Sequence, residues 1–177
     1  KHPLTAIVGG AKVSSKITII LKFLEKVDHL IIGGGMAYTF IKAQNGSVGK
    51  SLVEDEFLNL ALDILNEAKK QNVQLHLPVD SLCSKEFSND SKRYIRPINN
   101  IPDNEMGLDI GPETIKQFYK RSGESPNFLI DAEYDDLEVY FYIIGGLIDN
   151  TELDKTYENI NNNIFIQYND SIDAFGL

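Results

Sequence analysis

Short apolar runs alternate with helical patterns along the first two-thirds of the chain. Residues 4–8 form an apolar run that ends in Gly9 and Gly10, and residues 29–32 form a second run that ends in three glycines. Apolar residues recur at helical spacing over residues 14–27, between these runs. The pattern therefore predicts two buried strands that flank a helix, with Ser14 or Ser15 as the helix cap.

The same pattern continues beyond the second strand. It predicts helices over residues 36–43, 54–71 and 113–120, and strands over residues 73–79, 82–87 and 107–110. Polar residues dominate 88–105, where we expect a loop with one strand near Tyr94 and Ile95. Strands that alternate with helices favour right-handed βαβ units and a parallel sheet.

Glycines follow several of the predicted strands: Gly9 and Gly10, Gly33–Gly35, and Gly111. Ligands of parallel sheets bind beyond the carboxyl ends of the strands. We therefore expect these glycines to gather at one edge of the domain and to form part of a ligand site.

The last third of the chain differs in charge. Residues 1–121 carry 16 basic and 14 acidic side chains, whereas residues 122–177 carry one basic and 12 acidic side chains. This shift indicates a boundary near residues 121–126 and an acidic surface, which argues against a nucleic-acid partner. We expect tail strands over residues 128–130, 139–144 and 164–168, and residues 153–160 are the one candidate for a helix there.

Composition argues against a disulfide-stabilised protein and against a membrane-spanning one. The chain has 42% hydrophobic residues and a single cysteine, Cys83, so it cannot form an internal disulfide. No apolar stretch reaches the length that spans a bilayer. These features predict a globular protein of a reducing compartment, the cytoplasm, with no membrane partner.

Lys12 and Lys16 lie on successive turns at the start of the first predicted helix. The free N–H groups and the dipole at a helix N-terminus favour anions, so two lysines there indicate a phosphate site. The alternative is that the glycines form ordinary turns and that the lysines are solvated. Asp80 and Asp109 follow strands, and we interpret them as capping or turn residues rather than metal ligands.

Seven motifs in the first 121 residues closely resemble the C-terminal, nucleotide-binding domain of phosphoglycerate kinase, in that family's order and at nearly its spacing. They are IVGGAKVSSK at 7–16, IIGGGMAYTF at 31–40, VGKSL at 48–52, LPVD at 77–80, KEF at 85–87, IPD at 101–103 and MGLDIGPE at 106–113. The family transfers a phosphoryl group between ATP and 3-phosphoglycerate in glycolysis and uses magnesium.

The resemblance implies a role for each matching residue. By resemblance, Gly9, Gly10, Ala11, Gly33 and Gly34 form one wall of the ATP/ADP site. Leu52, Phe87, Gly107 and Leu108 line the adenine pocket. Lys16 contacts the nucleotide's phosphates, and Lys12 is the catalytic residue that reaches the phosphoryl group in transfer.

The sequence also departs from the family pattern. It begins where the family's second domain begins, so we expect no site for 3-phosphoglycerate unless a substrate domain is supplied elsewhere. The family's later Asn-Gly-Pro and Gly-Gly-Gly-Asp-Thr motifs are not found, and the second of these supplies the Mg2+ ligand. We expect this chain to show no turnover alone. Alternatives are a non-catalytic nucleotide-binding remnant, and a rearranged or engineered α/β scaffold whose acidic tail binds a partner.

Together these observations predict an α/β fold: a three-layer, Rossmann-like parallel sheet with helices on both faces. Residues 1–121 would be an incomplete nucleotide-binding domain. Residues 122–177 would be an acidic, β-rich tail that adds to the open side of the sheet. Neither the pattern nor the resemblance fixes the oligomeric state.

Overall fold

The computed structural model describes residues 3–88, 90–124, 127–131 and 164–167. The helices are α1 (Val13–Leu24), α2 (Met36–Ala43), α3 (Leu58–Lys70) and α4 (Pro112–Glu124), with a 3-10 turn, η1 (Asp55–Phe57), before α3. The strands are β1 (Leu4–Val8), β2 (His29–Ile32), β3 (Ser47–Val48), β4 (Gln74–His76), β5 (Asp80–Ser84), β6 (Arg93–Pro97), β7 (Asn100–Ile101), β8 (Met106–Ile110), β9 (Asn127–Asp131) and β10 (Ile164–Gln167).

A parallel sheet with strand order β10-β9-β1-β2-β4 forms the centre of the fold. Ala6 of β1 pairs with Leu30 of β2 on one side and with Leu129 of β9 on the other. The prediction of an α/β fold with a parallel sheet is confirmed. Strands β9 and β10, expected over residues 128–130 and 164–168, extend the sheet on the side of β1 away from β2. The tail elements expected over 139–144 and 153–160 lie outside the described residues.

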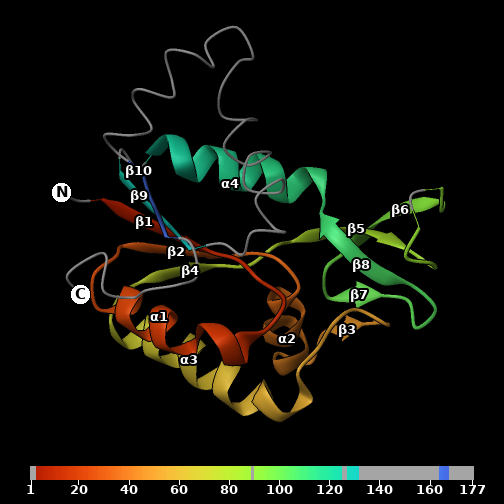
Figure 1. The fold of residues 1–177 in the computed structure, drawn as a ribbon, viewed down its shortest axis with the longest axis horizontal. Coiled ribbons are helices and arrows are strands. Elements are labelled where there is room, and N and C mark those ends of the chain that lie inside the picture. The colour runs from red at the N-terminus through yellow and green to blue at the C-terminus, as the bar shows by residue number, and fades with distance from the viewer. Residues whose placement is uncertain (1–2, 89, 125–126, 132–163, 168–177) are drawn as a thin grey trace, which may run out of the picture.

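The main core lies between the parallel strands and the first three helices. Buried side chains of β1 and β2 pack with buried side chains of α1, α2 and α3, among them Ile20, Phe23, Phe40 and Ile64. The parallel strands lie between this layer and α4 in Figure 1. Burial of these helix faces, which the 3.6-residue period predicted, stabilises the sheet. Among the described residues, no helix has the length and apolar character needed to cross a bilayer.

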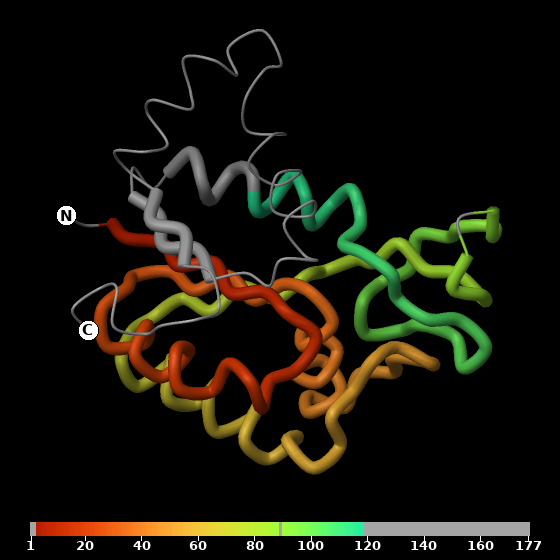
Figure 2. Tube along the Cα trace, in the orientation of Figure 1, coloured from red at the N-terminus to blue at the C-terminus, as the bar shows by residue number. Residues whose placement is uncertain are grey.

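The prediction of a single parallel sheet is wrong for residues 80–110. These residues form a separate antiparallel sheet, β6-β5-β8, which lies to one side of the parallel sheet (Figures 1 and 2). A further parallel pair is formed by β3 and β7, and β7 lies in the segment 88–105, where a loop with one strand near Tyr94 and Ile95 was expected. No helix separates β5, β6 and β8, and a parallel connection requires a long crossover, so these strands pair as antiparallel neighbours.

Element boundaries differ from expectation at several ends. The cap residue of α1 is Lys12, not Ser14 or Ser15, and it makes no side-chain capping bond. The strand expected over 73–79 is confined to β4, because Pro78 cannot donate a ladder hydrogen bond. The helix expected from residue 54 begins with η1, and α4 continues to Glu124.

Candidate functional site

The glycine loops after β1 and β2 contact each other directly. The Met36 N–H donates to the Gly10 carbonyl at 3.0 Å, and the Gly33 N–H donates to the Val8 carbonyl at 2.9 Å. Gly34 has a φ of +67°, and a Cβ atom there would lie 2.6 Å from the Gly10 oxygen. The absence of side chains therefore allows two backbones to meet at the carboxyl end of the parallel sheet.

Gly111 follows β8, a strand of the antiparallel sheet, so only the glycines after β1 and β2 follow strands of the parallel sheet. A Cβ atom at Gly111 would overlap the carboxylate of Asp80. That carboxylate accepts hydrogen bonds from the backbone N–H groups of Glu113 and Thr114, at 3.0 and 2.8 Å. Asp80 therefore caps α4, as predicted.

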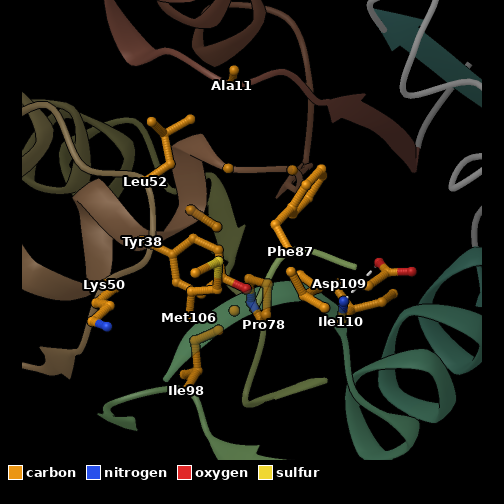
Figure 3. A pocket seen from close by; sticks show the side chains of 15 residues that line it. Ala11, Tyr38, Lys50, Leu52, Pro78, Phe87, Ile98, Met106, Asp109 and Ile110 are labelled. Atoms are coloured by element: carbon orange, nitrogen blue, oxygen red, sulfur yellow. Dashed lines mark hydrogen bonds between the residues drawn. The ribbon is translucent and has the colours of Figure 1, made fainter. Parts of the chain in front are cut away.

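A cavity of about 460 Å³ opens between the glycine loops and β8 (Figure 3). Six of the residues assigned by sequence to the nucleotide site line it: Ala11, Gly34, Leu52, Phe87, Gly107 and Leu108. The side chains of Leu52 and Phe87 are 50% and 87% exposed. An apolar slot with large exposed side chains at its mouth suits a flat, largely apolar group.

The other five predicted residues lie outside the cavity lining. Gly9, Gly10 and Gly33 belong to the loops that form its wall, but they do not line it. Lys12 is exposed and directly follows Ala11, so its backbone lies at the rim of the cavity. Lys16 is only 2% exposed, although it lies one turn further along α1. The structure thus places the two lysines in different environments.

The floor of the cavity contains a residue that the sequence reasoning missed. Tyr38 is 5% exposed, and its hydroxyl lies 2.7 Å from Ser81 Oγ, which in turn donates to the Asp109 carbonyl at 2.9 Å. Burial raises the pKa of Tyr38 well above its usual range, so the phenol stays neutral. A Cβ atom at Gly107 would overlap the Tyr38 hydroxyl, so Gly107 makes room for it.

Eight further residues line the cavity without having been assigned to it from the sequence. They are Gly35, Ala37, Lys50, Pro78, Ile98, Met106, Asp109 and Ile110. All of them except Ile98 lie within the seven motifs, for example Lys50 in VGKSL and Met106 in MGLDIGPE. Asp109 was interpreted from the sequence as a capping or turn residue; burial raises the pKa of its carboxyl, and a hydrogen bond from the Ile110 N–H partly opposes that shift. Motif membership was thus the signal in the sequence for seven of these positions, and Ile98 had none.

The Glu54 side chain caps the N-terminus of α1, although Glu54 follows Ser14 by 40 residues in the sequence. Its carboxylate accepts hydrogen bonds from the Ser14 N–H at 3.0 Å and from Ser14 Oγ at 2.6 Å. The Glu54 N–H donates to Thr39 Oγ1 at 3.1 Å, which links α2 to the same point. A carboxylate of the chain therefore occupies part of the anion site that the sequence assigned to phosphate.

Replacing Glu54 with alanine should lower the free energy of unfolding by about 1–2 kcal/mol, because the Ser14 N–H loses its acceptor at the start of α1. Chemical denaturation of the two proteins measures the change. Glu56→Ala is the control, since Glu56 is an exposed acid two residues away. Equal stabilities for the Glu54 and Glu56 variants would show that the capping bond contributes nothing.

Two observations bear on metal binding by the described residues. They contain no group of three or more histidine, cysteine, aspartate or glutamate side chains that could hold a metal ion. Asp80 uses both carboxylate oxygens as the cap of α4.

Comparison with known proteins identifies relatives for the first two-thirds of the chain. A family model described as phosphoglycerate kinase matches residues 1–129. Phosphoglycerate kinase of Elusimicrobium minutum is 52% identical over 120 residues, which are 68% of this chain and 30% of that protein. The protein from Synechococcus elongatus is 53% identical over 118 residues, 67% of this chain and 29% of its own length.

Solved structures give the same result for the fold. The structure of phosphoglycerate kinase from Coxiella burnetii superposes with a TM-score of 0.75 and 38% sequence identity, over 83% of this chain and 38% of that one. In sequence, this chain spans less than a third of the length of the relatives from Elusimicrobium minutum and Synechococcus elongatus.

Proposed function

The chain belongs to the phosphoglycerate kinase family, and from this we propose that residues 1–121 are its C-terminal, nucleotide-binding domain and that they bind ATP or ADP. We assign the parallel sheet to that domain's three-layer, Rossmann-like core. Residues 122–177 form an acidic tail that contributes β9 and β10. In this proposal the protein is cytoplasmic and acts in glycolysis.

The cavity between the glycine loops and β8 is the observation that carries the proposal. Its volume, about 460 Å³, lies within the range of small-molecule sites. Leu52 and Phe87 offer apolar surface at its mouth, and aromatic rings favour offset stacking on flat rings such as a nucleobase. A nucleobase in the cavity would cover apolar surface that the protein otherwise exposes to water.

The phosphates of the bound nucleotide would lie toward the start of α1. Lys12 is exposed beside Ala11 at the rim, so a flexible ammonium can reach a phosphate group there. Lys16 is buried, and its ammonium could contact a phosphate only if it became accessible. We therefore assign the principal phosphate contact to Lys12. Gly9, Gly10 and Gly33 would fix the loop backbone from which Lys12 extends.

Phosphoryl transfer to or from 3-phosphoglycerate is proposed for a fuller assembly only. The relatives that carry the family name are more than three times as long as the matched segment. Transfer depends on bringing two substrates together, and that proximity is worth about 7–11 kcal/mol. For this chain by itself we propose nucleotide binding without turnover.

Titration with ADP and with adenosine, followed by calorimetry, tests the proposal. Lys12→Ala should weaken ADP binding about tenfold and leave adenosine binding unchanged, because only ADP carries phosphates. Phe87→Ala should weaken both ligands by a similar factor, because both carry the base. Lys26→Ala, which removes an exposed lysine just after α1, is the matched control.

Two results would contradict the proposal in different ways. Absence of saturable ADP binding by the unmodified chain would favour a scaffold without a nucleotide site. Equal losses of ADP affinity in Lys12→Ala and Lys26→Ala would show that ADP responds to net charge alone.

A further inference from the structure

Phe87 is exposed in the segment that follows β5. The residue is 87% exposed, although burial of a phenylalanine is favourable. Serines on either side of it form hydrogen bonds: Ser84 Oγ donates to Ser91 Oγ at 2.7 Å, and Ser91 Oγ donates to the Ser88 carbonyl at 2.7 Å. Phe87 therefore offers apolar surface that a bound ligand could cover.

A second cavity lies beside the first and shares three residues with it. It has a volume of about 480 Å³, and Phe87, Leu108 and Asp109 line both cavities. Leu82, Ser88 and Arg93 complete its lining. The proposed nucleotide site uses the first cavity only, so the second one has no role in that proposal.

The floor of this second cavity is the outward face of the antiparallel sheet. Leu82 is half-buried, whereas the other residues of β5 are buried, and it pairs directly with Ile95 of β6. Ile95 is 48% exposed, so the apolar face continues beyond the cavity. Apolar surface of this kind, next to Phe87, suits the face of an aromatic ring.

The two arginines of β6 have different surroundings. Arg96 forms an ion pair with Glu105, because its Nε and one Nη donate to the two carboxylate oxygens of Glu105, each at 2.8 Å. The Arg96 guanidinium also lies over the Tyr94 ring. Arg93 is three residues earlier on the strand and lines the second cavity. Within the described part of the chain, the Arg93 side chain makes no hydrogen bond or ion pair, and the residue is exposed. Its guanidinium N–H groups are therefore available to a ligand.

We propose that the second cavity binds a planar aromatic carboxylate. The ring would lie against Phe87, Leu82 and Leu108, and the carboxylate would pair with the guanidinium of Arg93. Arginine suits this ligand because its fork of N–H groups matches a carboxylate in a bidentate geometry. Asp109 lines both cavities, and its carboxyl would repel an anion, so in this proposal the ligand's carboxylate pairs with Arg93 and lies away from Asp109.

Benzoate is the probe, titrated into the nucleotide-free protein and followed by NMR chemical shifts. We expect saturable binding, and about fivefold to tenfold weaker binding of benzamide, which has the same shape without the charge. Arg93→Gln should weaken benzoate by the same factor and leave benzamide unchanged. Because Arg93 is exposed, this substitution does not threaten the fold.

Lys92→Gln is the matched control, because it removes one positive charge from the adjacent residue. Lys92 is directed toward the Tyr94 ring, with its ammonium 5.3 Å from the ring centroid, and does not line the cavity. Benzoate affinity that falls equally in the Arg93 and Lys92 variants would overturn the proposal, as would the absence of saturation. Benzoate binding that is insensitive to Arg93→Gln and is abolished by saturating ADP would place the probe in the first cavity instead, and would also overturn it.

The outcome is separate from that of the nucleotide proposal, because the benzoate titrations contain no nucleotide and ADP enters only in the competition measurement. Phe87→Ala adds a second measurement: it should weaken benzoate and benzamide alike, since both use the ring. A protein that binds benzoate through Arg93 but shows no affinity for ADP would retain this site and lose the proposed function.

Discussion

Replacing Gly34 with alanine should lower the free energy of unfolding by about 3–5 kcal/mol, the largest effect expected of any single substitution discussed here. Gly34 has a φ of +67°, a conformation that costs an alanine about 1–2 kcal/mol. The new methyl would also lie 2.6 and 2.8 Å from the Gly10 oxygen and nitrogen. These are backbone atoms, so relief requires the two glycine loops to separate.

Thermal and chemical denaturation measure this change, and Gly35→Ala is the matched control. Gly35 has a φ of −61°, which alanine adopts freely, and its new methyl would meet the end of the Leu52 side chain at 3.0 Å. We expect Gly35→Ala to change stability by less than about 1 kcal/mol. Similar losses in the two variants would show that the contact between Gly34 and Gly10 has no special role.

Replacing Asp80 with alanine should lower the free energy of unfolding by about 3 kcal/mol, because one buried carboxylate satisfies several donors at the start of α4. Asp80 accepts from the N–H groups of Glu113 and Thr114, and from Thr114 Oγ1 at 2.6 Å. Only 8% of Asp80 is exposed, so water cannot easily replace these bonds.

Urea denaturation of Asp80→Ala, Thr114→Val and the double variant tests the network. Thr114 Oγ1 also accepts from the N–H groups of Val79 and Asp80, so the two side chains should couple strongly. Asp103→Ala is the control, because Asp103 is an exposed loop aspartate. Additive effects of the two substitutions, or a loss no larger than that of Asp103→Ala, would contradict the capping role.

Local pattern determined the elements that form the parallel sheet. The predicted boundaries of β1, β2 and α2 agree with the structure, because each is a short apolar run that ends at glycine or at a polar loop. The family resemblance is also a property of the sequence, and the family match over residues 1–129 supports it. The assignment of Asp80 as a cap followed from an aspartate placed directly after an apolar run.

The sequence-based predictions failed where a strand or a side chain has its hydrogen-bonding partner in a distant part of the sequence. The periodicity of residues 80–110 does not reveal that β5 pairs with both β6 and β8, in a sheet that is separate from β1 and β2. Glu54 was assigned to the first turn of its own helix, yet its carboxylate caps α1 through Ser14. In both cases a residue pairs with a partner 9 to 40 positions away.

The sequence by itself determined the family, the α/β class and six of the 15 residues that line the candidate cavity. Hydrophobic periodicity and secondary-structure propensity depend on residues that are close in the sequence, and so do sequence motifs. All three can therefore be recognised without a structure. Only the tertiary structure decided that Gly34 touches Gly10, that Lys16 is buried while Lys12 is exposed, and that Arg93 is free of the partner that Arg96 has. Burial and hydrogen-bond partners are properties of the packed chain, and they arise only when distant segments exclude water together.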